Sequence, residues 1–139
     1  MIGMRTKISD LTINQKREIA LLAIDYCKKK LGRRPYGVNL KVVQQRRGIE
    51  AYGEYNPYTK TIVVYHNNCK TVKDVVRVVL HEYTHYMQKR VTVVYNKLLK
   101  EYGYVKHPME IEARGNEKLY PACWKTVKSK LWLEVQLKL

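Results

Sequence analysis

The segment from Thr71 to Lys89 constrains the fold most, because it is a run of apolar residues at helical spacing with a start signal in front of it. Thr71 and Asp74 have the spacing of a capping box, which satisfies free amide groups in the first turn of a helix. Valine is only a middling helix former, but the cap and the 3.6-residue period together predict one long helix. Its apolar positions are Val72, Val75, Val76, Val79, Leu80, Tyr83, Tyr86 and Met87.

The same segment contains the motif HEYTH at residues 81–85. A helix brings residues i and i+4 onto one face, so His81 and His85 can both direct a ring nitrogen at one metal ion. Glu82 lies one step round the helix, where it can take a proton from a zinc-activated water. We therefore predict a zinc site with His81 and His85 as ligands and Glu82 as general base. The competing interpretation is a solvated helix face that spells the motif by chance.

A third ligand has to come from elsewhere, because a catalytic zinc usually has three protein ligands. The stretch PMEIEARGNE offers Glu110 and Glu112, which are two residues apart and cannot face the same way on a helix. Glu112 has Asn116 four residues later, so one face would carry a ligand and an amide able to orient one of the histidines. His107 is a further candidate. Spacing alone leaves the choice open.

The rest of the chain predicts an α+β fold with a small three-stranded sheet, antiparallel or mixed, packed on the HEYTH helix. Thr12 and Gln15 form a second capping-box pattern. We expect one domain, residues 1–139, made of a basic N-terminal helix (1–35), a core with the zinc site (36–118) and an amphipathic C-terminal helix (119–139). The expected elements are helix 13–31, strand 38–44, two strands within 51–67 around an Asn-Pro-Tyr-Thr turn, helix 92–102, a helix from Pro108 that Pro121 kinks or ends, and a final helix within 122–139.

HEYTH, followed 27 residues later by Glu112-Ala113 on a second helix, resembles the gluzincins, which are zinc peptidases with an HExxH helix and a glutamate as third ligand. In size the chain is most similar to the compact soluble minigluzincins. The resemblance covers roughly residues 36–118 and implies a zincin-like fold in which an edge strand of the sheet aligns the substrate. It selects Glu112, the glutamate immediately before alanine, as the ligand. The family often has Asp four residues further on, where this chain has Asn116.

The resemblance implies a zinc metalloendopeptidase that hydrolyses peptide bonds in a peptide or protein substrate. Such an enzyme also needs a donor for the oxyanion of the transition state, commonly Tyr, His or Arg. Tyr102, Tyr104, His107 and Arg114 are all close to the second motif. Among these we predict Tyr104.

The formal net charge of +15 suggests an alternative function. Residues 1–48 hold twelve Lys and Arg against three Asp and Glu, with the runs CKKKLGRRP and QQRRG. Clustered Lys and Arg can neutralise phosphates, so the alternative is a basic protein that binds nucleic acid non-specifically through its N-terminal third, with a structural or vestigial zinc site. A solvated surface explains the same charges without a partner.

Apolar runs are short and the cysteines are three in number. No run approaches the roughly eighteen residues that a membrane span needs, and the N-terminus lacks the apolar stretch of a signal peptide. Three scattered cysteines are typical of free thiols in a reducing compartment. We therefore expect a cytoplasmic protein. The tail 122–139 exposes Trp124 and Trp132 unless something covers them, which predicts packing across the cleft or a homo-oligomer through this helix.

Overall fold

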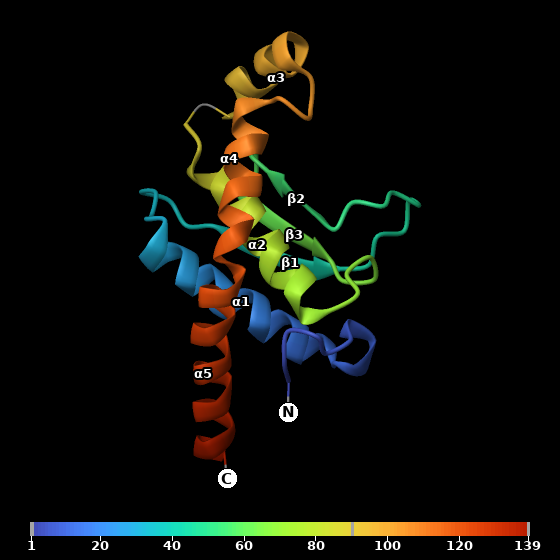
Figure 1. Ribbon diagram of the computed structural model, residues 1–139, viewed down its shortest axis with the longest axis vertical. Coiled ribbons are helices and arrows are strands. Elements are labelled where there is room, and N and C mark those ends of the chain that lie inside the picture. Colours follow the sequence, from blue (N-terminus) through green and yellow to red (C-terminus); the bar gives the residue numbers. More distant parts are fainter. Residues whose placement is uncertain (1, 90, 139) are drawn as a thin grey trace.

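The computed structural model describes residues 2–89 and 91–138, with residues 132–138 described by their backbone alone. Helices and strands follow one another as an α+β chain (Figure 1). In order they are a 3-10 helix η1 (Ile8–Asp10), α1 (Ile13–Lys30), β1 (Asn39–Val43), β2 (Gly53–Asn56), β3 (Thr61–Tyr65), α2 (Val72–Met87), α3 (Val91–Tyr102), α4 (Pro108–Asn116), a 3-10 helix η2 (Glu117–Leu119) and α5 (Tyr120–Lys138).

The helix α1 begins at the predicted capping box. The Gln15 amide donates to Thr12 Oγ1 at 3.1 Å, and the Thr12 amide donates to Gln15 Oε1 at 2.9 Å. After Lys30 the chain turns at Gly32, whose φ of 95° lies in the left-handed region that glycine favours. The predicted helix 13–31 is therefore confirmed to within one residue.

The sheet is mixed, with the strand order β1-β3-β2. The central strand β3 runs parallel to β1 and antiparallel to β2, and all five of its residues are buried. In the turn before β3, Asn56 Oδ1 accepts hydrogen bonds from the amides of Tyr58 and Thr59, at 2.9 and 3.3 Å. This arrangement leaves β2 at an edge of the sheet, beside α2.

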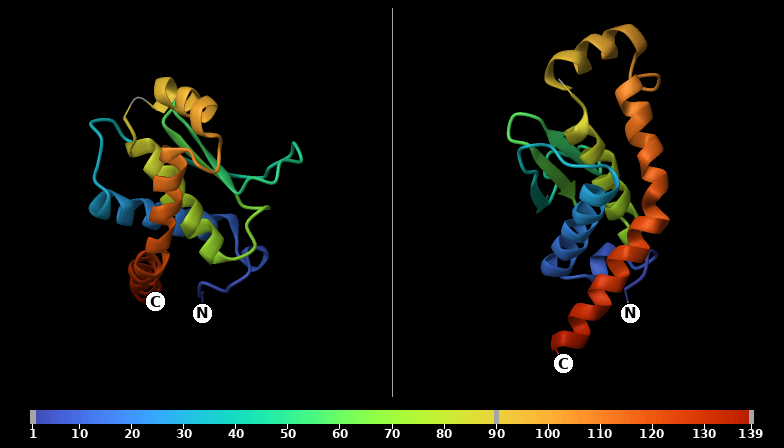
Figure 2. Two further views of the ribbon diagram at one scale, coloured as in Figure 1. Left: turned by 45° about the horizontal axis from the view of Figure 1, so that its top comes forward. Right: turned by 90° about the vertical axis from the view of Figure 1, so that its left-hand side faces the viewer.

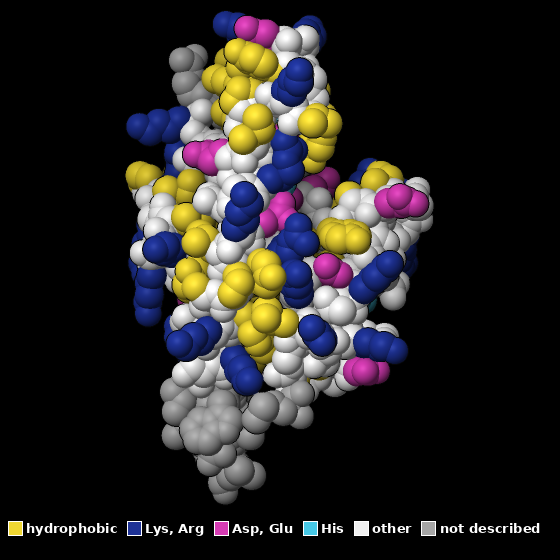
Figure 3. Space-filling model, in the orientation of Figure 1, with side chains coloured by type: hydrophobic (Ala, Val, Ile, Leu, Met, Phe, Trp, Pro, Cys, Tyr) yellow, Lys and Arg dark blue, Asp and Glu magenta, His cyan; other side chains and the backbone are white. Residues whose placement is uncertain are grey.

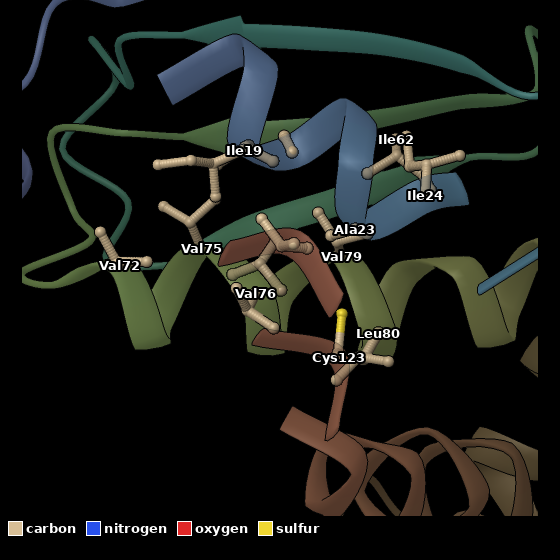
Figure 4. Packing of buried hydrophobic residues seen from close by; sticks show 14 of the residues in the cluster. Ile19, Ala23, Ile24, Ile62, Val72, Val75, Val76, Val79, Leu80 and Cys123 are labelled. Atoms are coloured by element: carbon tan, nitrogen blue, oxygen red, sulfur yellow. The ribbon is translucent and has the colours of Figure 1, made fainter. Parts of the chain in front are cut away.

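The helix α2 passes through the core. Asp74 Oδ2 accepts hydrogen bonds from the amides of Lys70 and Thr71, at 2.8 and 3.2 Å, which fixes the first turn. Valines of α2 then pack against α1, β3 and α5, as Figure 4 shows for Val75, Val76 and Val79. Because this packing surrounds α2, the HEYTH motif near its C-terminal end is held on a rigid support.

The last three elements, α4, η2 and α5, follow one another without a loop and form a long rod along one side of the molecule (Figure 2). The break in the predicted helix comes at Asn116, not at Pro121. Proline fits the first turn of a helix, where its missing amide hydrogen is not needed, and Pro121 lies in the first turn of α5.

The first half of α5 belongs to the core. Cys123 and Val127 are fully buried, and Trp124 is 5% exposed. Their contacts are with α1 and α2, in the same core cluster as the buried valines of α2. Trp124 is thus covered by the chain itself, which corrects the expectation that it lies across the cleft, whereas the side chain of Trp132 lies outside the described residues. None of the described helices is both long enough and apolar enough to cross a membrane.

Candidate metal centre and its cleft

Three side chains converge at the C-terminal end of α2. His81 Nε2 and His85 Nε2 each lie 2.9 Å from the same carboxylate oxygen, Oε1 of Glu110. The donor atoms of this group all lie within 4.8 Å of one another. His85 and Glu110 are buried, and His81 is half-buried. Two imidazoles and one carboxylate form a donor set that suits zinc, so the residues present fit the predicted metal.

The carboxylate that faces the histidines belongs to Glu110, and the prediction of Glu112 as the third ligand is therefore corrected. On α4 the inward face carries Glu110 and Ala113, and the small side chain of Ala113 is fully buried against α2. Glu112 is two residues from Glu110, about 200° further round the helix, and faces solvent. Its Oε1 accepts a hydrogen bond from Gln88 Nε2 at 2.8 Å.

The second ring nitrogen, Nδ1, of His81 and of His85 is also fixed by a hydrogen bond. His81 Nδ1 donates to Glu117 Oε2 at 2.8 Å, and the other oxygen of Glu117 accepts from Arg77 Nε at 2.9 Å. His85 Nδ1 donates to Gln88 Oε1 at 2.8 Å. Partners of this kind fix the ring orientation and leave Nε2 free to face a metal.

The prediction that Asn116 orients a histidine is also corrected. Its amide donates to Thr84 Oγ1 at 2.9 Å instead. The residues that do orient the rings, Glu117 and Gln88, were not identified from the sequence. For Glu117 a signal was present, because it lies seven residues after Glu110 and so on the same face of a continuous helix.

The centre attracts positive charge. Burial alone would lower the pKa of His81, but hydrogen bonds to Glu110 and Glu117 outweigh it and raise the pKa to about 10. The pKa of Glu110 moves the other way: burial opposes ionisation, yet the hydrogen bonds from His81, His85 and Tyr95 hold the pKa well below its usual range. A proton shared between a histidine nitrogen and the Glu110 carboxylate thus lies where positive charge is favoured. A divalent metal ion can take the place of that proton.

A tyrosine of α3 completes the surroundings of Glu110. The Tyr95 hydroxyl donates to Glu110 Oε2 at 2.7 Å. Behind it, the fully buried His107 accepts from the Met109 amide through Nδ1 and donates through Nε2 to the Tyr95 carbonyl, at 3.1 and 2.9 Å. Both nitrogens of His107 are therefore used to cap α4 and hold α3. This structural role replaces the idea of His107 as a ligand.

Glu82 lies near both histidines and lines a pocket with each of them. Its side chain is 9% exposed, and it accepts no hydrogen bond from any residue that the structure describes. Burial raises its pKa to about 7, although the neighbouring His81 and His85 act in the opposite direction. Near neutral pH this carboxyl can therefore both accept and release a proton.

Two pockets meet at Glu82, and the edge strand β2 runs beside both. One, of about 360 Å³, is lined by His81 and Gly53, and we name it the His81-side pocket. The other, of about 310 Å³, is lined by His85 and Tyr55, and we name it the His85-side pocket. Together they form a cleft across the candidate centre.

Tyr104 lines the His81-side pocket together with His81 and Glu82. Burial and the nearby carboxylates raise the pKa of Tyr104, so its hydroxyl stays protonated and can donate a hydrogen bond. Tyr102 and Arg114, two of the other residues considered as oxyanion donors, line neither pocket. The Arg114 guanidinium instead lies 5.9 Å from the centre of the Tyr104 ring.

The chain matches no protein-family model, no curated protein and no solved structure. What the cleft does therefore has to be inferred from its own residues. Those residues are the three donors His81, His85 and Glu110, whose side chains are fixed by hydrogen bonds. Beside them are the buried carboxyl of Glu82 and the hydroxyl of Tyr104, which line the same pocket.

Proposed function

We propose that this chain is a zinc metallopeptidase of the gluzincin type, with His81, His85 and Glu110 as ligands and Glu82 as general base. One observation carries the proposal: a single oxygen of Glu110 lies 2.9 Å from Nε2 of both histidines, while the carboxyl of Glu82 faces the cleft beside them. A chance HExxH sequence on a helix surface has no reason to meet a buried carboxylate from another helix.

The residues of the cleft divide the reaction between them. A bound zinc lowers the pKa of water to about 7 and polarises a carbonyl group. Glu82, whose pKa is raised to about 7, takes the proton of the attacking water and passes it to the leaving amine. The Tyr104 hydroxyl donates a hydrogen bond to the oxyanion that forms on the carbonyl oxygen.

The strand β2 supports a peptide as the substrate. It pairs with β3 along one edge only, and its other edge borders both pockets. An extended peptide can add to such an edge through main-chain hydrogen bonds, with its alternate side chains entering pockets. The length of the cleft on both sides of Glu82 suits cleavage within a chain.

The proposal is tested with the variant Glu82→Gln, which keeps the size of the side chain and removes its ability to accept a proton. The zinc-loaded variant is expected to keep one zinc per chain, measured by mass spectrometry, and to lose cleavage of a peptide library by at least about 10²-fold. Asp25→Asn on α1 is the matched control and should cleave like the unchanged protein. A Glu82→Gln protein that cleaves at the original rate, or an unchanged protein with full zinc and no cleavage of any peptide, would contradict the proposal.

A further inference from the structure

We propose that the His81-side pocket binds a cationic side chain of the substrate, so that the enzyme cuts next to lysine or arginine. This rests on the proposed peptidase function. The lining of the pocket is the starting point: it includes four of the twelve acidic residues in the chain and one of the 27 basic residues. The acids are Glu50, Asp74, Glu82 and Glu117, and the base is Arg77.

The single base does not neutralise the pocket. Arg77 Nη2 lies 2.9 Å from Glu117 Oε1, and Glu117 also holds His81. Asp74 uses Oδ2 to cap α2, and its other oxygen has no partner among the described residues. Glu50 is exposed and forms no ion pair with a described Lys or Arg. Two of the carboxylates that line the pocket therefore form no ion pair among the described residues and are free to meet a cation.

Glu82 adds an independent indication of a ligand. A carboxyl that is nine-tenths buried normally has a hydrogen-bond partner, because burial without one is costly. Glu82 has none among the described residues, and it is aimed into the pocket. Its carboxylate oxygens reach the pocket and are available to a ligand from outside the chain.

Aromatic rings complete the pocket. Tyr52 and Tyr104 both line it, and both are partly exposed. The face of a tyrosine ring attracts an ammonium or guanidinium group. Carboxylates and tyrosine rings together form a lining suited to lysine or arginine, and less suited to an uncharged side chain of the same length.

The His85-side pocket differs in chemistry. It is lined by no Lys or Arg, its acidic residues are Glu82 and Glu110 of the centre itself, and its other residues outside the centre are uncharged. On the face shown in Figure 3, acidic side chains are scattered among lysines, arginines and apolar side chains, and some of them lie near the middle of the view. Besides the shared Glu82, three acidic residues line the His81-side pocket, whereas Glu110 alone is added in the His85-side pocket, in a chain with a net charge of +15. The residues of the second pocket are Tyr55, Pro57, Tyr58, Val91, Thr92, Tyr95 and Asn96, beside the centre itself.

The net charge of the protein and the acidic lining of the pocket predict opposite peptide preferences, so one binding experiment can distinguish them. A protein of charge +15 attracts acidic peptides and repels basic ones. The probes are neutral-coumarin-labelled octapeptides of alanine and serine that carry one central lysine, norleucine or glutamate. Anisotropy with the full chain, its metal removed by chelation, at about 0.15 M salt reports binding without turnover. We expect the lysine peptide to bind about fivefold more tightly than the norleucine peptide.

Glu50→Lys should remove this preference. Asp25→Lys changes the net charge by the same amount at another exposed site and should retain it. Asp74→Asn, which keeps a residue able to cap α2, should weaken it. Equal binding of the lysine and norleucine peptides, tighter binding of the glutamate peptide, or an equal loss in Asp25→Lys would overturn the proposal.

The same peptides separate failure of the pocket from failure of the peptidase function. With zinc-loaded protein, faster cleavage of the lysine peptide supports both. Cleavage without discrimination overturns the cationic pocket and leaves the peptidase intact. Lysine-selective binding without any cleavage supports the pocket and overturns the peptidase.

Discussion

Glu110 uses its two carboxylate oxygens for different tasks. Oε1 faces both histidines, and Oε2 accepts the Tyr95 hydroxyl at 2.7 Å. Because each oxygen has its own partners, the carboxylate is not free to rotate. A metal at the centre would meet one oxygen of Glu110, already aimed at it, so little side-chain ordering remains to be done on binding.

The choice between two glutamates gives a direct test of the ligand set. Glu110→Ala removes the oxygen shared by the histidines and should weaken zinc binding by more than about 100-fold, a loss beyond that of an outer partner. Glu112→Ala removes only a contact to Gln88 and should weaken it far less. Zinc content after dialysis against a competing chelator compares the two. Loss of zinc from Glu112→Ala alone would reverse the assignment.

Tyr104 can be tested by removing a single oxygen atom. Tyr104→Phe should lower kcat about 10²-fold with little change in KM, because a donor to the oxyanion acts in the transition state and not in the bound substrate. Tyr102→Phe, which alters an exposed residue that lines neither pocket, is the control. An unchanged kcat in Tyr104→Phe would remove this role.

The residues of the centre were only partly predictable. HEYTH places two histidines and a glutamate on one helix by spacing alone, and the structure brings those histidines together. Glu110 and Glu112 could not be separated in this way, because the side of α4 that faces α2 depends on where α4 docks. The resemblance to the gluzincins favoured Glu112, the glutamate directly before Ala113. In the structure the buried Ala113 instead lies on the same face of α4 as Glu110.

At the scale of elements, local signals predicted helices and strands well and connections less well. Capping boxes and periodicity gave α1 and α2 nearly to the residue, β-branched runs gave β1 and β3, and the Asn-Pro-Tyr-Thr turn indicated β2. The sequence did not predict that β1 pairs in parallel with β3, because a short β-branched run gives no information on the direction in which a strand pairs. The interruption of the rod at Glu117–Leu119 lies between Gly115 and Pro121, and was expected at the proline.

Gly53 marks the closest approach between β2 and α2. A methyl group added there would fall within 2.5 Å of the Val63 carbonyl oxygen and closer still to the Val78 side chain. Gly53→Ala should therefore lower the free energy of unfolding by about 1–3 kcal/mol. Gly115→Ala, in α4 with open space around it, should raise it by up to about 1 kcal/mol. Chemical denaturation measures both, and equal stability of the two variants would contradict this packing.

At the scale of the molecule, some of the basic residues of the N-terminal third have structural roles. Arg34, from one of the two basic runs, donates to the Tyr36 hydroxyl at 2.9 Å and to the Met87 carbonyl at 3.2 Å, which are structural contacts. The lysines at the end of α1 suit the negative end of a helix dipole. Binding of nucleic acid by the N-terminal third stays a prediction, to be tested by a salt-sensitive gel shift.

Stability of the metal-free protein should depend on pH through the centre. The folded pKa of His81, about 10, is above its ordinary value of 6.5, so the folded state binds the proton more tightly. This contribution is complete below pH 6.5 and is lost as the pH rises towards 10. The melting temperature of metal-free protein should fall over that range, and zinc, which replaces the proton, should reduce the fall. A flat profile without metal would contradict the assigned contacts.

The helix α3 combines two properties that are seldom found in one element. None of its residues is buried, yet it supplies Tyr95 to the centre and Val91, Thr92 and Asn96 to a pocket. Substitutions along α3 therefore cost the core little and reshape one wall of the cleft. In evolutionary terms, α3 is the segment where the selectivity of the proposed peptidase could drift without loss of the scaffold, and exchanging it would be the simplest way to redirect that activity to another target.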